Sequence, residues 1–489
     1  MQLTIQSPFK PLMGAFILSV LLAVGVVLLA LATGLPGVRI ATFFAVNVCA
    51  VLAFQVFSGN SGIVSFGHTA FMGVAAYVSA WITMPASMLR LNLPNLPDFL
   101  GGYEFGLPVA LCVVAIVGAV VALVSGLGIS RLNGASGAIA TLGFVIIIYS
   151  VLAAAVDFTR GNQAFFGIPR YTDIYVATGA ACLFIVAARL FRESRHGLTL
   201  RAVRDDEAAA SSLGVSPYKA RLIAWVVSGI MASIAGALYG HMLGAFSPRD
   251  FYLASTFGFV AMLILGGMGT VTGAVGGVVL VMGIREVLQR FEGGVVIAGY
   301  ELPDLFGLQV LGVSIAMLAV LKYRRDGLCG RNELAENIDV PARVTVDQNP
   351  KDGAKITASP ALRIDKVDKK FAGLTALDNV TFDIPVGSVT GLIGPNGAGK
   401  STLVNAIGGA SKATSGGVWL SQTRIDTAPP HRVARLGVGR TFQNIRLFSN
   451  LTVEENVVVA GLGRGLSMRR AREVAARELF LMGITGDAT

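Results

Sequence analysis

The residues best suited to chemistry lie in one short run of small residues that ends in a lysine and two hydroxyl side chains. The run consists of Gly394, Pro395, Asn396, Gly397, Ala398, Gly399, Lys400, Ser401 and Thr402. It matches the pattern G-x-x-x-x-G-K-[ST], which predicts a phosphate-binding loop between a strand and a helix. Small residues let successive backbone N–H groups turn toward phosphate oxygens, and the start of a helix favours negative charge. Lys400 is expected to reach the β- and γ-phosphates, and Ser401 to coordinate Mg²⁺.

This loop alone does not distinguish a kinase, a GTPase and a transport ATPase, so the surrounding elements matter. Apolar and β-branched residues predict strands over residues 362–367, 380–384 and 389–393. Helical patterns begin at Ser401 and near Ser467. Strands followed by helices predict an α/β domain over residues 361–489.

The composition predicts that a membrane domain precedes this α/β domain. The chain has 489 residues, of which 54% are hydrophobic and only 14% charged, with a mean hydropathy of +0.68. Residues 1–321 hold 16 Lys+Arg and 13 Asp+Glu, whereas the much shorter stretch 322–489 holds 23 and 16. The formal net charge of +10 does not indicate nucleic-acid binding, because membrane proteins are expected to carry basic cytoplasmic loops.

Apolar runs long enough to cross about 30 Å of hydrocarbon recur through the first 325 residues. They cover residues 12–33, 38–57, 62–84, 107–130, 137–156, 172–190, 222–243, 255–288 and 305–321. The basic loop 189–221 and the basic residues after 321 are both expected to be cytoplasmic. An even number of crossings must therefore lie between these two basic regions. This parity requires the run 255–288 to be two short crossings, hinged at the glycine-rich residues 266–270. We therefore expect a transmembrane domain of about ten crossings over residues 1–325, and a linker over 326–360.

The α/β part resembles the ATPase subunit of an ABC transporter, which is an ATP-binding family. The resemblance rests on KKFAGLTALDNVTFDI, LIGPNGAGKSTL, TSGGV and VGRTFQNIRLFSNLTVEENV. It implies that Phe371 stacks on adenine, and that Gln443 contacts Mg²⁺ and the attacking water. The alternatives are that Phe371 is a buried strand-end side chain and that Gln443 is a surface amide.

Three parts of that family's site do not follow Gln443 in this sequence. They are an LSGGQ-like signature, a hydrophobic strand ending in Asp-Glu, and a switch histidine, since His431 precedes Gln443. Without the carboxylate that would polarise water, the 489-residue chain by itself is not expected to hydrolyse ATP. We expect a second polypeptide to complete the domain, or the sequence to be a fragment.

The membrane part resembles the permease of the high-affinity branched-chain amino acid importers, in the form fused to its ATPase. The resemblance rests on GNSGIVSFGHTAFMGVAAYVSA, LRAVRDDEAAASSLGVSPYKARLIAW and FVAMLILGGMGTVTGAVGG. It implies a bacterial inner membrane location with a cytoplasmic C-terminal domain. It also implies as partners a second homologous permease, a second ATPase subunit and a periplasmic substrate-binding protein. The substrate would be a branched-chain amino acid or a related amino acid, amide or urea.

Two further expectations concern the membrane part. Residues 193–214 look like the coupling segment of ABC importers, in which a small-residue helix face seats in a cleft of the ATPase. The polar residues Asn60 and His68 lie in or beside a predicted span and are expected to form interhelical hydrogen bonds. The alternative is a functional site. Two other classes remain open: an ABC exporter, and a passive channel or secondary transporter with a degenerate nucleotide-binding domain.

Overall fold

The structure is a computed structural model that describes residues 2–6, 10–292, 296–297, 300–301, 306–324, 326–330, 333–334, 341–345 and 360–484. The chain divides into two compact units. The helical unit comprises Gln6–Gly197 and Arg221–Val340, and the sheet unit comprises Met1–Ile5, Leu198–Ala220 and Pro341–Thr489.

The helical unit is built from long apolar helices. Among the described residues, eight stretches are long and apolar enough to cross a membrane: Leu12–Ala32, Gly34–Gly59, Leu107–Ile129 (α4), Gly134–Ala154 (α5), Ile174–Glu193 (α7), Pro217–Leu243 (α10), Pro248–Gly266 and Val271–Glu292 (α12). The first two are successive helices that share the label α1 (Lys10–Phe54) and are separated by a non-helical break at Gly34 (φ 66°), close to Pro36. The second continues into the π-helical turn η1 (Gln55–Gly59).

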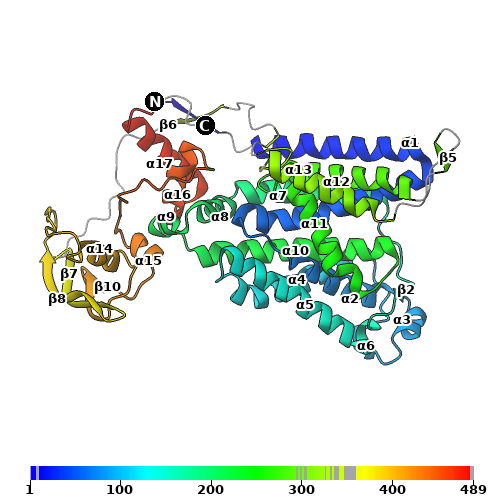
Figure 1. The fold of residues 1–489 in the computed structure, drawn as a ribbon, viewed down its shortest axis with the longest axis horizontal. Coiled ribbons are helices and arrows are strands. Elements are labelled where there is room, and N and C mark those ends of the chain that lie inside the picture. Colours follow the sequence, from blue (N-terminus) through cyan, green and yellow to red (C-terminus); the bar gives the residue numbers. More distant parts are fainter. Residues whose placement is uncertain are drawn as a thin grey trace. The chain divides into compact units, whose positions relative to one another are not determined.

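Shorter elements complete this unit. They are α2 (His68–Thr83), α3 (Ala86–Asn92), η2 (Asp98–Leu100), α6 (Val156–Thr159), β2 (Phe165–Phe166), β3 (Ala245–Phe246), η3 (Pro248–Phe251), α11 (Leu253–Gly266), β4 (Val296–Ile297), β5 (Tyr300–Glu301) and α13 (Leu308–Tyr323). Helix α12 packs against α1, α11 and α13 (Figure 1).

The expected break in the run 255–288 is confirmed. Helix α11 ends at Gly266 and α12 begins at Val271, and between them Gly267 adopts a φ of 122° that other residues rarely reach. A Cβ atom on Gly277 would overlap the backbone carbonyl of Met262, so α11 and α12 can approach this closely only because glycine faces the contact. We call the four residues between α11 and α12 the hinge.

Three segments meet at the hinge. Leu328 N and Cys329 N donate to Leu265 O and Gly266 O at 3.0 Å each, and Arg192 Nε at the end of α7 donates to a hinge carbonyl at 3.3 Å. At the opposite end of α7, β2 pairs with β3 in an antiparallel two-stranded ladder. The hinge, the end of α7 and the residues after α13 therefore lie at one end of the bundle, as the parity argument requires.

The expected linker over residues 326–360 was partly wrong, because residues 326–330 and 333–334 pack into the helical unit. These residues lack an apolar period, and their backbone hydrogen bonds and one buried carboxylate hold them in place. Of the rest, β6 (Pro341–Thr345) pairs with β1 (Gln2–Gln6). Residues 331–332, 335–340 and 346–359 lie outside the described residues.

A buried polar and aromatic cluster lies inside the helical unit. His68 bonds to Ser65 Oγ through Nδ1 and to Ser228 Oγ through Nε2, each at 2.9 Å, and its ring lies 5.2 Å from that of Trp225. The Ser228 contact joins α2 to α10, so the expected interhelical hydrogen bond of His68 is confirmed. Asn60 Nδ2 instead donates within its own helix, to Val56 O at 2.9 Å.

The sheet unit contains a four-stranded antiparallel sheet in the order β10-β9-β7-β8. Its strands are β7 (Leu362–Phe371), β8 (Leu374–Ile384), β9 (Ser415–Leu420) and β10 (Thr423–Arg424). Its helices are α8 (Arg195–Asp205), which begins in the helical unit, α9 (Glu207–Ser212), α14 (Lys400–Ile407), α15 (Pro430–Arg435), α16 (Val453–Gly463) and α17 (Met468–Leu481). The buried core comprises Ile364, Val367, Leu377, Leu403, Val418, Ile425 and Val433.

The third predicted strand, over residues 389–393, is not formed, and this prediction was wrong for the structure. Val389 and Ile393 are almost fully exposed there. A strand that is apolar on both faces takes its hydrogen bonds from neighbouring strands on either side. None of the described residues supplies such a neighbour at this position. The other two predicted strands are present within β7 and β8.

Candidate nucleotide site and coupling segment

The predicted phosphate-binding loop leads directly into α14. Gly397 and Gly399 have φ values of 87° and 85°, and Lys400 is the first helical residue. A Cβ atom on Gly399 would overlap Ala376 O of β8, so glycine permits both the turn and the close packing of the loop on the sheet. Leu403 and Ala406 anchor α14 in the core.

Lys400 lies back over its own loop. Its Nζ atom donates to Gly394 O and Pro395 O, each at 2.6 Å. The ammonium group is thus held on the loop by two neutral carbonyl acceptors. Phosphate oxygens would form stronger, charge-assisted hydrogen bonds with the same group. Ser401 is exposed at the first turn of α14, with Thr402 beside it.

The other two predicted site residues lie on separate segments. Phe371 ends β7 with its side chain 48% exposed, and the Lys369 Nζ atom lies 4.7 Å from the centre of its ring. The alternative of a buried strand-end phenylalanine does not describe this exposed ring. Gln443 is exposed in the loop before α16, and within the described residues no hydrogen bond joins it to Lys400 or Ser401. The loop residues 394–402 are therefore contiguous, whereas Phe371 and Gln443 are not brought to them by direct contact.

The segment Leu198–Ala220, which we call the coupling segment, packs on α15 and α16 inside the sheet unit. Ala209 and Ala210 of α9 are buried, so the expected small-residue face is present. Gly214 follows α9 with a φ of 96°, and Arg435 Nε donates to its carbonyl oxygen at 2.9 Å. A Cβ atom on Gly214 would lie 2.7 Å from Gly463 O. The coupling segment and the end of α16 can therefore approach this closely because both contact residues are glycines.

Acidic residues of the coupling segment receive donors from the loop after Gln443. Arg446 Nη1 donates to both carboxylate oxygens of Asp206, at 2.9 and 3.2 Å. Asn450 donates to Asp205 through its backbone N and its Nδ2 atom, each at 2.8 Å. Asp206 also caps α9 by accepting from Ala209 N at 2.8 Å. These contacts fix the register of α9 on the sheet unit.

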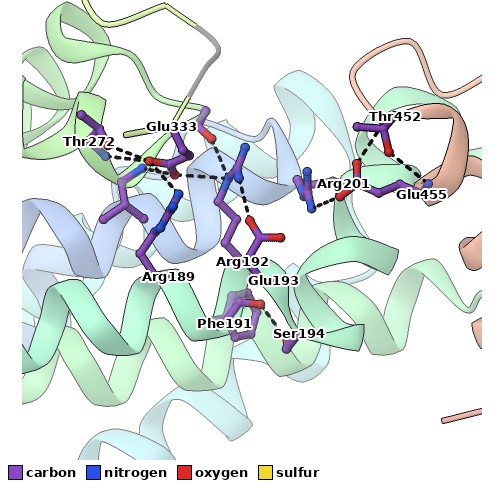
Figure 2. A network of polar contacts seen from close by, with 12 residues as sticks. Arg189, Phe191, Arg192, Glu193, Ser194, Arg201, Thr272, Glu333, Thr452 and Glu455 are labelled. Atoms are coloured by element: carbon purple, nitrogen blue, oxygen red, sulfur yellow. Dashed lines mark hydrogen bonds and ion pairs between the residues drawn. The ribbon is translucent and has the colours of Figure 1, made fainter. Parts of the chain in front are cut away.

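A basic residue of α8 reaches the start of α16. Arg201 Nη2 donates to Glu455 Oε1 at 2.9 Å, and both side chains are largely buried (Figure 2). Thr452 and Glu455 form a capping box at the N-terminus of α16. The coupling segment therefore binds a carboxylate that is itself fixed by the helix start.

An arginine-aromatic stack connects the Gln443 loop with the coupling segment. The guanidinium groups of Arg440 and Arg446 lie 5.1 and 5.0 Å from the centre of the Phe442 ring. Phe442 precedes Gln443, and Arg446 holds Asp206. A displacement of the Gln443 loop would therefore also displace the coupling segment, through the Phe442–Arg446 stack and the Arg446–Asp206 ion pair.

Sequence reasoning missed Arg435, Arg446, Asn450 and Glu455 as contact residues. The T-x-x-E capping box at Thr452 was readable from the sequence, because that spacing is a helix-start signature. Arg435, Arg446 and Asn450 contact residues that lie more than 200 positions away in the sequence, and no local sequence pattern indicates such contacts.

Burial changes the acidity of two groups near this surface. Burial raises the pKa of Glu454 above its ordinary value, although Arg472 opposes this change. Burial, together with Arg435, Arg432 and Lys219, lowers the pKa of His431. His431 therefore favours the neutral form in a positive environment, which also keeps further positive charge off α15.

Known families match both parts of the chain. The family described as branched-chain amino acid transport system / permease component matches residues 37–314, and the ABC transporter family matches residues 377–488. The chain is similar to the high-affinity branched-chain amino acid transport ATP-binding protein LivG of Escherichia coli, with 40% identity over 129 residues. These are 24% of this chain and 51% of LivG.

Two further relatives match the same part. The corresponding protein BraF of Pseudomonas aeruginosa is 42% identical over 101 residues, or 21% of this chain and 40% of BraF. The galactofuranose transporter ATP-binding protein YtfR of Escherichia coli O157:H7 is 34% identical over 125 residues, or 26% and 25% of the two chains. The chain spans about half the length, or less, of these curated relatives.

The permease match covers more than half of the chain, and of the long apolar stretches only Leu12–Ala32 lies wholly outside its range. The ABC transporter match includes the phosphate-binding loop, and that family implies ATP binding. The chain is therefore a multi-pass membrane protein that belongs to the branched-chain amino acid permease family, with an ABC transporter segment in the same polypeptide.

Proposed function

We propose that this chain is one subunit of an ATP-driven importer that carries branched-chain or related amino acids into the cytoplasm across a bacterial inner membrane. The observation that carries the proposal is the coupling segment. It belongs to a permease-family chain and is held by Arg446, Asn450 and Arg435 on a segment of the ABC transporter family. ATP-dependent movement of that segment would reach the membrane helices through α7 and α10, which flank it in the sequence.

The proposed nucleotide site uses the loop 394–402 for phosphate and Phe371 for adenine. The half-exposed Phe371 ring offers an aromatic surface that could stack on a planar base. The N–H groups at the start of α14 and the Lys400 ammonium group would hold the β- and γ-phosphates. Lys400 would exchange its two carbonyl acceptors for phosphate oxygens when the nucleotide binds.

The donor set also fits Mg²⁺, which prefers oxygen ligands and retains several waters. The Ser401 hydroxyl is exposed where it can face a bound phosphate, and Gln443 offers an amide oxygen from an exposed loop. Bound there, the ion would neutralise charge on the phosphates. Gln443 would move toward Ser401 for this contact, and the Phe442 stack would carry that movement to Arg446.

Three of the partners proposed for the chain rest on the two family matches, and the fourth rests on exposed apolar residues of the chain. They are a second homologous permease, a second ATPase subunit, a periplasmic substrate-binding protein, and a polypeptide segment that pairs with residues 389–393. The exposed apolar side chains of Val389 and Ile393 support this last partner, because burying apolar side chains away from water is favourable.

Uptake measurements test this proposal. Cells that lack their own leucine transport and carry this chain with its native partners should accumulate labelled leucine against a gradient. Lys400→Ala should reduce uptake to background without reducing the amount of chain in the membrane. Net loss of leucine from preloaded cells would instead indicate an exporter, and uptake that is independent of Lys400 would indicate a passive transporter.

A further inference from the structure

A single buried carboxylate, Glu333, organises the hinge end of the helical unit. Its side chain is 1% exposed. One oxygen accepts from Val271 N at 2.7 Å, and the other accepts from Thr272 N at 3.1 Å and Thr272 Oγ1 at 2.8 Å. Glu333 thus caps the N-terminus of α12 from a segment that follows α13 in the sequence.

The same carboxylate pairs with two arginines of α7. Arg189 Nη1 lies 3.0 Å and Arg192 Nε 3.5 Å from its oxygens (Figure 2). Arg192 Nε also donates to Gly269 O of the hinge at 3.3 Å. Burial alone would raise the pKa of Glu333, but the two arginines and the α12 N–H groups lower it below its ordinary value, so the group stays charged.

Backbone contacts extend this attachment. Leu334 N donates to Thr272 Oγ1 at 3.1 Å, and Arg189 Nη2 donates to Leu334 O at 3.3 Å. Leu328 N and Cys329 N bond to the last turn of α11. Gly327, with a φ of 83°, allows residues 326–330 to approach the hinge, where a Cβ atom on Gly327 would overlap Gly267. We call the described residues 326–330 and 333–334 the strap.

The strap ties together parts of the chain that a coupling mechanism must connect. Helix α7 ends at Glu193, and α8, which leads into the coupling segment, begins at Arg195 with only Ser194 between them. If Glu333 only capped α12, one acceptor oxygen would suffice and the ion pairs with Arg189 and Arg192 would not be needed. Because Glu333 is held both by two arginines of α7 and by three donor groups of α12, the positions of α7 and α12 are fixed against each other.

We propose that Glu333 is a positioning residue for transport, which clamps the end of α7 to the hinge so that movement of the coupling segment displaces the broken helix pair α11–α12. The role rests on the proposed function, because it concerns how ATP hydrolysis drives transport. The strap moves with α7 and α12 as one body and stays attached throughout the cycle.

The first test separates the charge of Glu333 from its role as a cap. Glu333→Gln keeps an oxygen that can accept from the α12 N–H groups but removes the ion pairs with Arg189 and Arg192. In membrane vesicles carrying the chain with its native partners, we expect leucine uptake per ATP hydrolysed to fall about tenfold or more. The amount of chain and its photolabelling by an ATP analogue should be unchanged. A wild-type uptake ratio in this variant would overturn the proposal.

The second test replaces the ion pairs with a covalent bond. A Cβ atom on Gly276 of α12 would lie 2.8 Å from Cys329 Sγ in the strap, close to the roughly 3 Å that a disulfide requires. Gly276→Cys should form a disulfide with Cys329 on mild oxidation and keep wild-type uptake. In the Glu333→Gln background, the disulfide should restore the uptake ratio, and reduction should remove it again. Gly276→Ser is the matched control, because it cannot form the bond.

The outcomes separate this proposal from the proposed function. Uptake that the disulfide blocks in the otherwise wild-type chain would show that the strap must detach, and would overturn the proposal. A disulfide that forms but does not restore coupling in Glu333→Gln would also overturn it. Absence of leucine uptake in the wild-type vesicles themselves would instead contradict the proposed function.

Discussion

At the residue scale, Gly399 is the position where the phosphate-binding loop depends most on one residue type. Alanine there would have to adopt a φ of 85°, which costs about 1–3 kcal/mol, and its Cβ atom would overlap Ala376 O. We expect Gly399→Ala to weaken ATP-analogue photolabelling about tenfold or more. Gly465→Ala is the control, since Gly465 has a φ of 93° but no atom within 4 Å. Equal labelling of Gly399→Ala and the wild type would contradict the loop geometry.

Glu454 in α16 gives a prediction about pH. Its pKa in the folded chain is raised, so the stability that it contributes is present below its unfolded pKa and is lost as the pH rises through the folded pKa. Glu454→Gln should therefore melt at a higher temperature than the wild type at about pH 8, with a smaller difference at about pH 5. Thermal unfolding of the full chain measures this.

The control for this measurement is Glu473→Gln in α17, which removes a carboxylate from pairs with Arg469 and Arg470 near the surface. The melting temperature of Glu473→Gln, relative to that of the wild type, should not increase as the pH rises. A melting temperature of Glu454→Gln that falls below the wild type with rising pH would show that the Arg472 pair outweighs burial.

The individual residues differ in how far the sequence revealed them. The glycine turn within residues 394–402 could be predicted because it depends on adjacent positions and on backbone conformation, while the roles of its side chains stay predictions. Arg446 and Glu333 could not, because their partners, Asp206 and the N-terminus of α12, lie far away in the sequence. An isolated charged residue looks the same in a sequence whether it is solvated or buried in an ion pair.

At the scale of elements, the α11–α12 pair depends on Gly277. A Cβ atom there would overlap Met262 O, a backbone atom that cannot move without displacing α11. We expect Gly277→Ala to destabilise the helical unit by about 1–3 kcal/mol. Gly283→Ala in the same helix has no atom within 4 Å and should be neutral or slightly stabilising. Thermal unfolding in detergent compares them, and equal melting temperatures would contradict the observed packing.

The elements show which physical signals a sequence carries. The break between α11 and α12 was predictable because charge parity and a glycine run both required it. The strand at 389–393 was predicted from its apolar residues, but a strand forms only when neighbouring strands bond to it. The strap was mistaken for a linker because Leu328 and Cys329 are held by backbone hydrogen bonds, which leave no hydrophobic pattern.

At the scale of the whole molecule, the proposed topology places both the coupling segment and the strap in the cytoplasm. Single cysteines at Ala208 and Asp326, introduced into a chain without its native cysteines, should react with a membrane-impermeant maleimide only from the cytoplasmic side. A cysteine at Glu104, in the loop before α4, should react from the periplasmic side and serves as the control. Periplasmic labelling at Ala208 or Asp326 would contradict the parity argument.

The central claim is that the ABC transporter segment drives the permease part through the coupling segment. Arg446→Glu tests it most directly, because Arg446 bonds both carboxylate oxygens of Asp206 and a reversed charge would repel that residue. Arg469→Glu on the exposed surface of α17 is the matched control. The measurement is leucine uptake, with ATP-analogue photolabelling of the same samples. The account predicts that Arg446→Glu reduces uptake to background and keeps photolabelling, while Arg469→Glu retains both. Wild-type uptake by Arg446→Glu would contradict the account.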